Sequence, residues 1–349
     1  MLRTLGFKYK VLRGNAEFAQ LLAMPDASPP NIRMNDTGAI KVSFSGTFLP
    51  LPDGVDLLSD EIAPVLIVDG VEHQLGVFMP ATVSESEDAA AASVSIEAYD
   101  RSWRLSTART EALQYFAAGT NYLDAVKLLL TDAGVTTVIE TPTAATLAEA
   151  RQDWDVGTSY LEIVNQLLSE INYKEIWFNA SGAAVLEPVV TPTAENITHT
   201  LDDTEIASLM LPSLRRSTDL FSAPNVFVCI CSNPDKPAAL TATAENDNPY
   251  SPLSITRRGR RIVSVEYVDN IASQTELEAY VARRRNGSMI RGETLIVQTA
   301  LLPGYGVDEI TALYYKDFTA ICLERGFTMD LRVGGVMTHT LERVVYVLE

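Results

Sequence analysis

The spacing of apolar residues changes twice along this chain of 349 residues. In the first hundred residues, apolar side chains alternate with polar ones, which is the period of half-buried β-strands. Between residues 119 and 172 the period becomes that of an α-helix, and after about residue 200 the alternation returns. The pattern therefore predicts an α+β chain, mostly β, in which a helical region separates two β regions.

Short strands separated by turns fill the first β region. Residues 65–78 contain Asp69-Gly70, a dipeptide that strongly favours a two-residue hairpin turn. The stretch 84–93 has no apolar period, so we expect it to form an exposed hairpin tip. Several such strands are typical of a barrel or a sandwich. The residues predicted to face the core of this region are Ile40, Val42, Phe44, Val94, Ile96 and Ala98.

Two helices are predicted from a repeated segment. Residues 119–134 (GTNYLDAVKLLLTDAG) and 157–172 (GTSYLEIVNQLLSEIN) share Gly, Thr, Tyr, Leu, Val, Leu and Leu at the same offsets. Asn121 and Ser159 stand at the N-cap positions, each with an acidic residue three positions later. Because a β-rich piece follows each helix, we interpret the repeat as a paired helix–strand unit. The alternative is a chance similarity of two amphipathic helices.

A third helix is predicted over residues 273–289, ending at Asn286-Gly287 and packing back on the middle domain. Strands precede and follow it, so the late part of the chain returns to β structure. The predicted division is a first β-barrel domain over residues 1–101, an α+β domain over 102–199 plus about 262–293, and a second β-barrel domain over 200–261 plus about 294–349.

The charge of the chain is strongly negative. Its 45 acidic and 27 basic residues give a formal net charge of −18. Nonspecific nucleic-acid binding depends on neutralising phosphates with basic side chains, so we expect the surface as a whole to repel DNA. The apolar run at residues 226–231 is far shorter than the roughly 20 residues of a spanning helix. We therefore expect no membrane segment. The first residues lack the apolar stretch of a signal peptide, so we expect the protein to stay in the compartment where it is made.

Metal and redox chemistry find little support in the residue pattern. No two of the three histidines, His73, His199 and His339, lie at ligand spacing. Cys229 and Cys231 are two apart on a predicted strand, so they share one face, and neither a C-x-x-C motif nor a second ligand pair is present. We expect buried, unreactive thiols, no metal and no cofactor.

One segment offers a weak case for glycan chemistry. Asp153 and Asp155 flank Trp154, an arrangement that could mimic a sugar platform beside two carboxylates. The alternative is that Trp154 packs over the start of the second helix. We favour packing, and no nucleophile elbow, P-loop or zinc-protease motif is present. The prediction is a protein that is not an enzyme and has no catalytic residue.

Basic residues gather in two places on this acidic chain. Four arginines occur within residues 257–261, at the end of a block (232–262) that is interpreted as two β-arms joined by Asn/Pro turns. Three more occur on the third predicted helix. They could bind phosphate, be solvated, or pair with acidic faces of neighbouring subunits, and we favour the last. The subunit-interface candidates are Arg257, Arg258, Arg260, Arg261, Arg283, Arg284 and Arg285.

Four segments of the chain resemble a known family. They are residues 45–82, 97–105 (EAYDRSWRL), 115–130 (YFAAGTNYLDAVKLLL) and 232–263. In these segments the chain resembles the tail-tip or baseplate hub proteins of bacteriophages and prophages. It is also similar to the late control protein D family and to the hubs of contractile injection systems. The shared motifs are structural, so they carry over no catalytic residue.

The resemblance implies an architecture and a set of partners. It implies two related β-barrels with an α+β domain between them, and a homotrimer whose six barrels form a ring that continues the tail tube. It implies a virion protein at the tail tip or baseplate, assembled in the bacterial host cytoplasm, with a role in DNA ejection and host-cell attachment. The partners implied are a distal tail protein ring, the tape-measure protein, and a spike or receptor-binding fibre, with DNA passing through an acidic lumen.

Two other functions stay open at this point. A tail-associated cell-wall hydrolase requires two carboxylates in a cleft, for which Asp153 and Asp155 are the candidates. A carbohydrate-binding tail adhesin requires exposed aromatic side chains, and the aromatic content is only 8%. The hub is the function we expect, because it explains the β, α+β, β order of the chain.

Overall fold

The computed structural model describes every residue except 1–2, 26, 88–91, 191, 205–207, 218–222, 232–238, 269–270, 272, 290–292 and 344–349. The chain divides into two compact units. The first contains Met1–Thr191, Thr299–Asp308 and Arg325–Thr338, and the second contains Pro192–Gln298, Glu309–Glu324 and His339–Glu349. Strands make up 45% and helices 14% of the chain, so the predicted mostly-β composition is confirmed.

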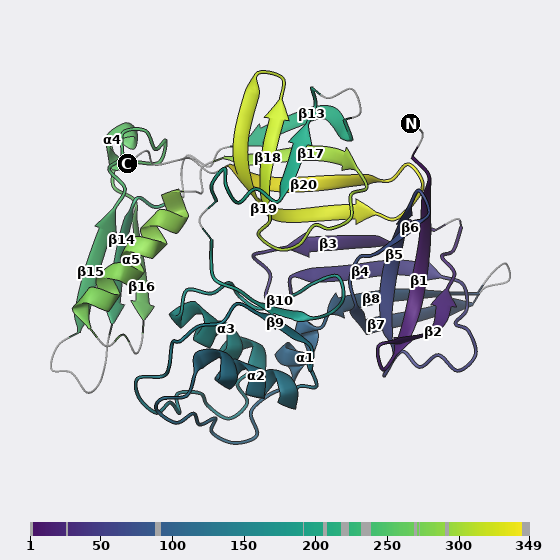
Figure 1. Ribbon diagram of the computed structural model, residues 1–349, viewed down its shortest axis with the longest axis horizontal. Helices are drawn as coiled ribbons and strands as arrows, with labels where there is room; N and C mark the ends of the chain where they lie inside the picture. Colours follow the sequence, from purple (N-terminus) through teal and green to yellow (C-terminus); the bar gives the residue numbers. More distant parts are fainter. Residues whose placement is uncertain are drawn as a thin grey trace. The chain divides into compact units, whose positions relative to one another are not determined.

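The first unit is built on one antiparallel sheet (Figure 1). In spatial order its neighbouring strands are β3, β4, β8, β7, β5, β1 and β2, with β6 beside β5 and Arg325–Asp330 of β19 beside β3. Their bounds are β1 Leu5–Arg13, β2 Ala16–Leu21, β3 Asn31–Asn35, β4 Val42–Phe48, β5 Glu61–Val68, β6 Val71–Gln74, β7 Phe78–Glu87, β8 Ala92–Asp100 and β19 Phe318–Asp330.

The predicted hairpins of this sheet are confirmed. Asp69 and Gly70 both have positive φ (50° and 87°) and join β5 to β6, where Val68 pairs with Val71. This is the backbone that a two-residue hairpin turn requires. Strands β7 and β8 pair as far as Glu87 and Ala92, and residues 82–87 are exposed. The exposed hairpin predicted within 84–93 is therefore confirmed as far as this pair, and residues 88–91 lie outside the described part.

Aromatic side chains fill the core of this sheet. The rings of Tyr9 and Phe48 meet edge-on at 5.2 Å, and those of Phe44 and Phe78 lie 5.6 Å apart. Such pairs stabilise a core beyond the area they bury. The predicted residues Phe44, Val94, Ile96 and Ala98 are buried, whereas Ile40, which precedes β4, and Val42 are only partly buried. The core is completed by other strands of the same unit.

The rest of the first unit is helical, with a small second sheet. The repeated segments form the predicted helices α2 (Tyr122–Asp132) and α3 (Tyr160–Glu170). The Asn121 side chain accepts a hydrogen bond from the Leu123 backbone, and the Ser159 side chain accepts one from the Glu162 backbone, so both N-caps are confirmed. The remaining elements are α1 Ser102–Thr107, β9 Val138–Glu140, β10 Trp177–Phe178 and β11 Ala184–Leu186.

The two helices share one core, as a paired unit requires. Equivalent positions, Leu129 on α2 and Leu167 on α3, are both fully buried in it. The Tyr122 hydroxyl donates a hydrogen bond to a Glu170 carboxylate oxygen at 2.9 Å, which joins the start of one helix to the end of the other. This packing supports the interpretation as a paired helix–strand unit, which stays a prediction.

The second unit contains two sheets. One follows the order β13, β17, β20, β19, with β18 between β19 and the parallel strand β12. The other has the order β15, β14, β16. None of the sheets in the described part of the chain closes into a barrel. The bounds are β12 His199–Asp202, β13 Met210–Ser217, β14 Val226–Cys231, β15 Leu240–Glu245, β16 Val263–Val268, β17 Thr294–Ala300, β18 Ile310–Tyr315 and β20 Val336–Arg343.

The third helix, α5 (Gln274–Met289), lies over the three-stranded sheet (Figure 1). Leu277 and Val281 are buried against Phe227, Cys229 and other residues of β14 and β15. The prediction that this helix packs on the middle domain is therefore wrong, because its apolar side chains bury against strands that follow that domain. Its end was also predicted too early, since the helix continues past Asn286-Gly287. The boundaries of the three predicted domains stay a prediction.

No helix within the described ranges is both long enough and apolar enough to span a membrane.

Candidate interaction surfaces

The first arginine cluster begins on a single helical turn, α4 (Ile255–Arg258), where two β-arms were predicted. The Ser254 hydroxyl caps this turn by accepting a hydrogen bond from the Arg257 backbone. Gly259 ends it with φ of 63°, a left-handed conformation that favours glycine. The Arg258 guanidinium donates to the Ala223 carbonyl at 2.6 Å, so this arginine anchors the turn to the start of the adjoining strand.

Arg261 pairs with Glu245 across the end of the three-stranded sheet. Its two terminal nitrogens donate to the two carboxylate oxygens at 2.9 and 2.5 Å. The bidentate hydrogen bond holds the pKa of Glu245 below its ordinary value and raises the pKa of Arg261. Both side chains are about half exposed, so the ion pair lies at the surface and its charges remain in contact with solvent.

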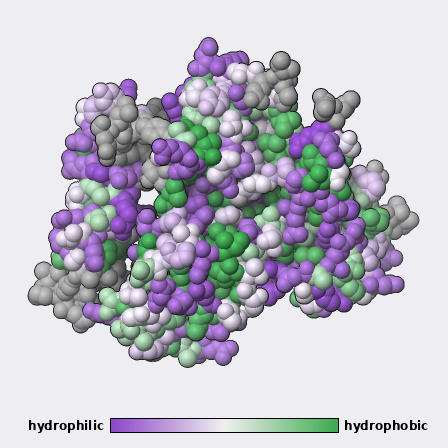
Figure 2. Space-filling view, viewed as in Figure 1, coloured by the Kyte–Doolittle hydropathy of each residue, from purple (hydrophilic) through white to green (hydrophobic). Residues whose placement is uncertain are grey.

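The second arginine cluster lies on α5. Arg284 donates to Glu266 of β16 at 2.8 Å, Arg283 lies over the Tyr280 ring, and Arg285 donates to its neighbour Asn286. These contacts are all made within the unit. The structure therefore places the seven predicted residues on α4, on the short segment that follows it and on α5, all in one unit, and their role between subunits stays a prediction. Figure 2 shows a largely hydrophilic surface over α5 in the view of Figure 1.

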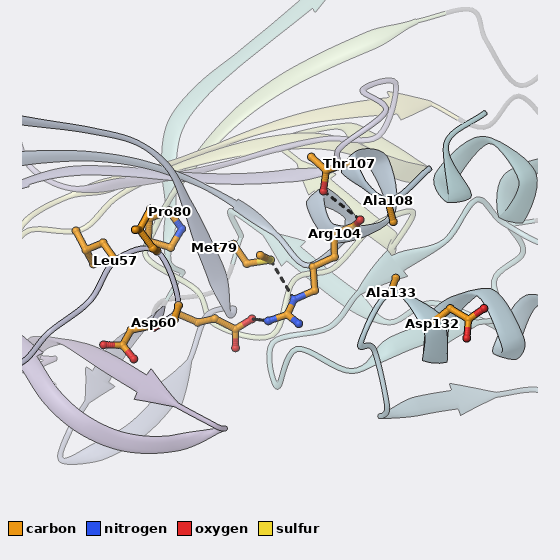
Figure 3. A pocket seen from close by; sticks show the side chains of 12 residues that line it. Leu57, Asp60, Met79, Pro80, Arg104, Thr107, Ala108, Asp132 and Ala133 are labelled. Atoms are coloured by element: carbon orange, nitrogen blue, oxygen red, sulfur yellow. Dashed lines mark hydrogen bonds and ion pairs between the residues drawn. The ribbon is translucent and has the colours of Figure 1, made fainter. Parts of the chain in front are cut away.

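A cleft of about 530 Å³ opens in the first unit beside Arg104 (Figure 3). It is lined by the loop before β5, by the start of β7 and by the ends of α1 and α2. Arg104 donates to Glu61 at 3.3 Å and through Nε to the Met79 sulfur at 3.2 Å. Leu58 on the rim is 98% exposed.

The carboxylates of this cleft are held by arginines. Glu61 is buried and accepts from Arg101 at 3.0 and 2.6 Å, and Asp60 is buried and accepts from Arg13 at 2.8 and 2.7 Å. The Arg13 hydrogen bond holds the pKa of Asp60 below its ordinary value. Paired in this way, the two carboxylates fix the loop in place, which is a structural role.

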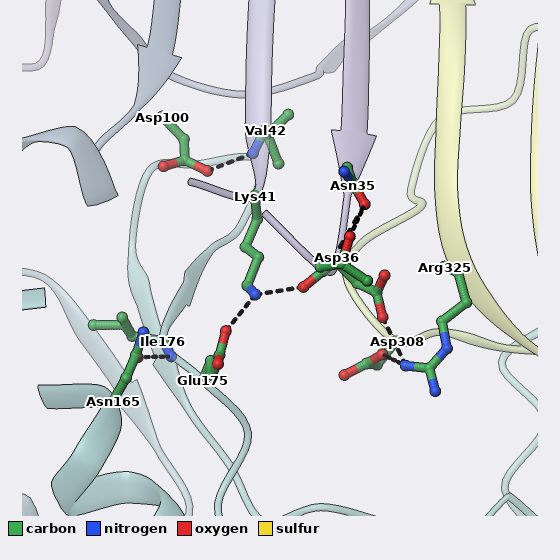
Figure 4. A network of polar contacts seen from close by, with 11 residues as sticks. Asn35, Asp36, Lys41, Val42, Asp100, Asn165, Glu175, Ile176, Asp308 and Arg325 are labelled. Carbon is green, nitrogen blue, oxygen red and sulfur yellow. Dashed lines mark hydrogen bonds and ion pairs between the residues drawn. The ribbon is translucent and has the colours of Figure 1, made fainter. Parts of the chain in front are cut away.

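A second polar network lies at the edge of the first sheet (Figure 4). Arg325 bridges Asp36 at 2.6 Å and Asp308 at 3.0 Å. Lys41 is 4% exposed and binds Glu175 and the Asp36 carbonyl. Burial raises the pKa of Asp36, opposed by the nearby Arg325. The network connects segments far apart in the sequence and stabilises this edge of the unit.

A buried acid–imidazole pair was missed in the sequence. In the second unit, Nδ1 of His339 lies 2.8 Å from an oxygen of Glu324, and both side chains are fully buried. The sequence signal that could have found it is the alternation along β19. Glu324 follows the buried residues Ala320 and Cys322 at intervals of two, so its side chain lies on the same buried face. Burial raises the pKa of Glu324 and raises that of Cys322 to about 12. All three cysteines are buried and free, as predicted for Cys229 and Cys231.

The segment considered for glycan chemistry is a packing element. Trp154 is buried, its ring meets Phe116 edge-on at 5.7 Å, and its indole nitrogen donates to Gln166 of α3 at 2.8 Å. Asp153 is bound by Arg151, which also donates to Glu170 at 2.8 Å. The interpretation that Trp154 is a packing residue is confirmed, although its hydrogen bond is to Gln166 within α3 and not to the start of that helix. Within the described residues, no group of three His, Cys, Asp or Glu side chains has the geometry of a metal site.

The sequence matches no known family model and none of the curated proteins, but solved structures match the fold. The tail protein from Neisseria meningitidis MC58 has a TM-score of 0.67 and 11% identity, over 97% of each chain. The 43 kDa tail protein of prophage MuSo2 from Shewanella oneidensis also has a TM-score of 0.67, with 10% identity over 96% of this chain and 98% of that one.

A third match comes from a secretion machine. A component of the Escherichia coli type VI secretion system has a TM-score of 0.54 and 13% identity, over 98% of this chain and 79% of that one. It is itself described as similar to the T4 bacteriophage tail proteins gp27 and gp5. The chain thus has the fold of phage and prophage tail proteins, and the predicted resemblance is confirmed in the fold.

Proposed function

We propose that the chain is a structural protein of a phage or prophage tail, and that it acts by assembly. The observation that carries this proposal is the match of nearly the whole chain to two tail proteins of nearly the same extent, each with a TM-score of 0.67. Because the match covers nearly the whole chain, both units support the proposal, and not one common domain.

Within the tail, we assign the chain to the hub of the tip or baseplate. The likeness to a type VI secretion component, described as similar to gp27 and gp5, supports this place. As the hub, it joins the tail tube to a spike or receptor-binding apparatus and contacts a distal tail ring and the tape-measure protein. It resides in the virion after assembly in the host cytoplasm, and serves host attachment and DNA ejection.

The proposed assembly is a homotrimer in which β units of the three copies close a ring. Each copy has antiparallel sheet in both of its units, and these are the regions that we assign to the two barrels. A ring requires a heterologous interface, in which one surface meets a different surface. The arginines of α4 and α5 on a chain of net charge −18 supply one side of such an interface.

The acidic charge supports a role as a DNA conduit. Phosphate groups are repelled by a negative wall, so DNA does not adhere to it during passage. We propose no catalytic activity, and the burial of Trp154 removes the exposed platform on which the glycan-cleaving alternative depended.

The test is the mass and shape of the purified protein. Light scattering over a concentration series should give three times 38.1 kDa, and negative-stain averages of that species should show a ring with an open centre. A monomer at every concentration, both alone and when mixed with the neighbouring tail proteins of the same virion, would contradict the hub assignment.

A further inference from the structure

The three-stranded sheet of the second unit has helix α5 on one face. Along β16, Ser264, Glu266 and Val268 face the helix side, where Glu266 binds Arg284. The alternate residues Val263, Val265 and Tyr267 face the other way and are 54%, 51% and 76% exposed. They form a row of large apolar side chains that we call the open face.

An exposed apolar row on an edge strand is unusual for a soluble surface. In the order β15, β14, β16, the strand β16 is at the edge, so its outer backbone groups also face outward from the sheet. Natural proteins normally protect such edges with charge, bulges or a covering element, because they otherwise aggregate. The row therefore indicates a surface that is covered when the protein functions.

Arginine side chains border the open face. Arg261 has the same parity as Val263 and lies just before the strand, where it is paired with Glu245 of β15. Arg257 and Arg260 are exposed nearby in sequence. Residues 239–289 contain seven arginines and six carboxylates, a net charge of 7 − 6 = +1, in a chain of −18. The occupant of this face should accordingly be apolar at one end and acidic at the other.

The β7–β8 hairpin has this composition. Val83, Glu85 and Glu87 alternate along β7 and share one face of the hairpin, and Val83 is 40% exposed. Strand β7 pairs with β5 only at Phe78, so its outer edge beyond that point carries no strand in the described structure. Read toward its tip, the hairpin presents one apolar residue and then two carboxylates.

We propose that the open face binds the β7–β8 hairpin of a second copy of this chain. The proposal rests on the assembly proposed above and names the two surfaces that meet. Val83 packs on Val263 and Val265, while Glu85 and Glu87 lie against the arginine border. On both strands, residues two positions apart lie on the same face and are about 6.8 Å from each other. If the two strands run antiparallel, the valines can therefore lie opposite Val83 while the arginines lie opposite the two glutamates.

This contact is heterologous, because the hairpin and the open face are different surfaces of one chain. Such contacts propagate from copy to copy and close when the rotation permits, as a ring requires. The hairpin covers apolar area that is exposed in one copy, and the charge pairing sets the direction of docking.

The test is crosslinking between two differently substituted chains. One carries Val83→Cys, the other carries Val265→Cys, and they are mixed, assembled and treated with a short bismaleimide. Because the three native cysteines are buried, crosslinking is confined to the introduced ones. The matched control replaces Val265→Cys with Ala279→Cys, which is exposed on α5 at the opposite side of the same sheet.

Crosslinked dimers with Val265→Cys, at a yield several-fold above the Ala279→Cys control, support the proposal. A ring that forms with no crosslink, or with equal yields for the two partners, overturns this contact and leaves the hub assignment intact. A monomer with no crosslink overturns both, whereas a crosslinked pair that never forms a ring supports the contact and counts against the hub.

A charge variant tests the acidic end of the hairpin. Glu85→Arg with Glu87→Arg on the Val83→Cys chain should lower the crosslink yield several-fold, and added salt should lower the yield of the unmodified hairpin. These residues are exposed, so the variants should fold. An unchanged yield in both experiments would overturn the assignment of the arginine border.

Discussion

Glu324 and His339 meet at 2.8 Å in the fully buried interior of the second unit. The second oxygen of Glu324 has no hydrogen-bond partner among the described residues. A carboxylate left half-satisfied in a core is costly, which is why burial raises the pKa of Glu324. Other ionisable groups near the pair are Glu309, His199, Cys322, Arg343 and Glu293.

The first prediction concerns the pH dependence of stability. The pKa of Glu324 in the folded protein is raised above its unfolded value of about 4.3. The stability that Glu324 contributes is therefore fully present below that value and is lost as pH rises through the folded pKa. Glu324→Gln, which resembles the protonated acid, should remove this loss of stability at higher pH. Urea unfolding of both proteins over a pH series measures it, and parallel profiles would contradict the assignment. Glu278→Gln on the exposed face of α5 is the control.

The second prediction concerns the buried ion pair of Arg101 and Glu61. Arg101→Met leaves the Glu61 carboxylate buried with only the more distant Arg104, so the free energy of unfolding should fall by about 3–5 kcal/mol. Adding Glu61→Met should recover much of that loss, because the uncompensated charge is then gone. Chemical denaturation of the two single variants and the double variant measures the coupling. Additive losses would show that the pair is not coupled.

An exposed ion pair provides the comparison for that cycle. Lys127 pairs with Asp124 and Glu140 on the surface of the first unit. Lys127→Met should change the free energy of unfolding by less than about 1 kcal/mol, since exposed pairs are screened by water and salt.

The third prediction uses the repeated helices. Leu129→Ala and Leu167→Ala remove equivalent, fully buried side chains from one shared core, so each should cost about 2–5 kcal/mol. Asn121→Ala and Ser159→Ala remove the two N-caps and should each cost about 1 kcal/mol. Thermal and denaturant unfolding measure all four. A core variant that unfolds only one helix, seen by hydrogen exchange, would contradict the paired unit.

The fourth prediction separates the arginines by function. Arg284→Ala removes an intrachain pair in which the Arg284 side chain is 56% exposed and the Glu266 side chain 33% exposed, so the unfolding free energy should change by at most about 1 kcal/mol and the oligomer should remain. Arg257→Glu should instead weaken the oligomer and leave the unfolding curve nearly unchanged, because Arg257 is exposed and belongs to the arginine border that we assign to the contact between copies. Sedimentation of both variants at several concentrations distinguishes the two effects.

Local chemistry determined much of this protein from sequence. Asp69-Gly70 produced its hairpin because both residues tolerate positive φ, and Asn121 and Ser159 began their helices because their side chains satisfy backbone amides. The alternation in β8 identified Val94, Ile96 and Ala98 as buried because a strand has only two faces. Each of these features depends on residues that are near one another in the chain.

Only the tertiary structure decided which surfaces meet. Helix α5 was recognisable from Leu277 and Val281, but its packing partner was not, because an apolar face fits any strands that present a complementary one. The buried contact of Glu324 with His339 depends on strand pairing, and the open face of β16 depends on which side α5 covers. Periodicity gives the faces of an element, whereas the partner of each face is fixed by contacts between distant parts of the chain.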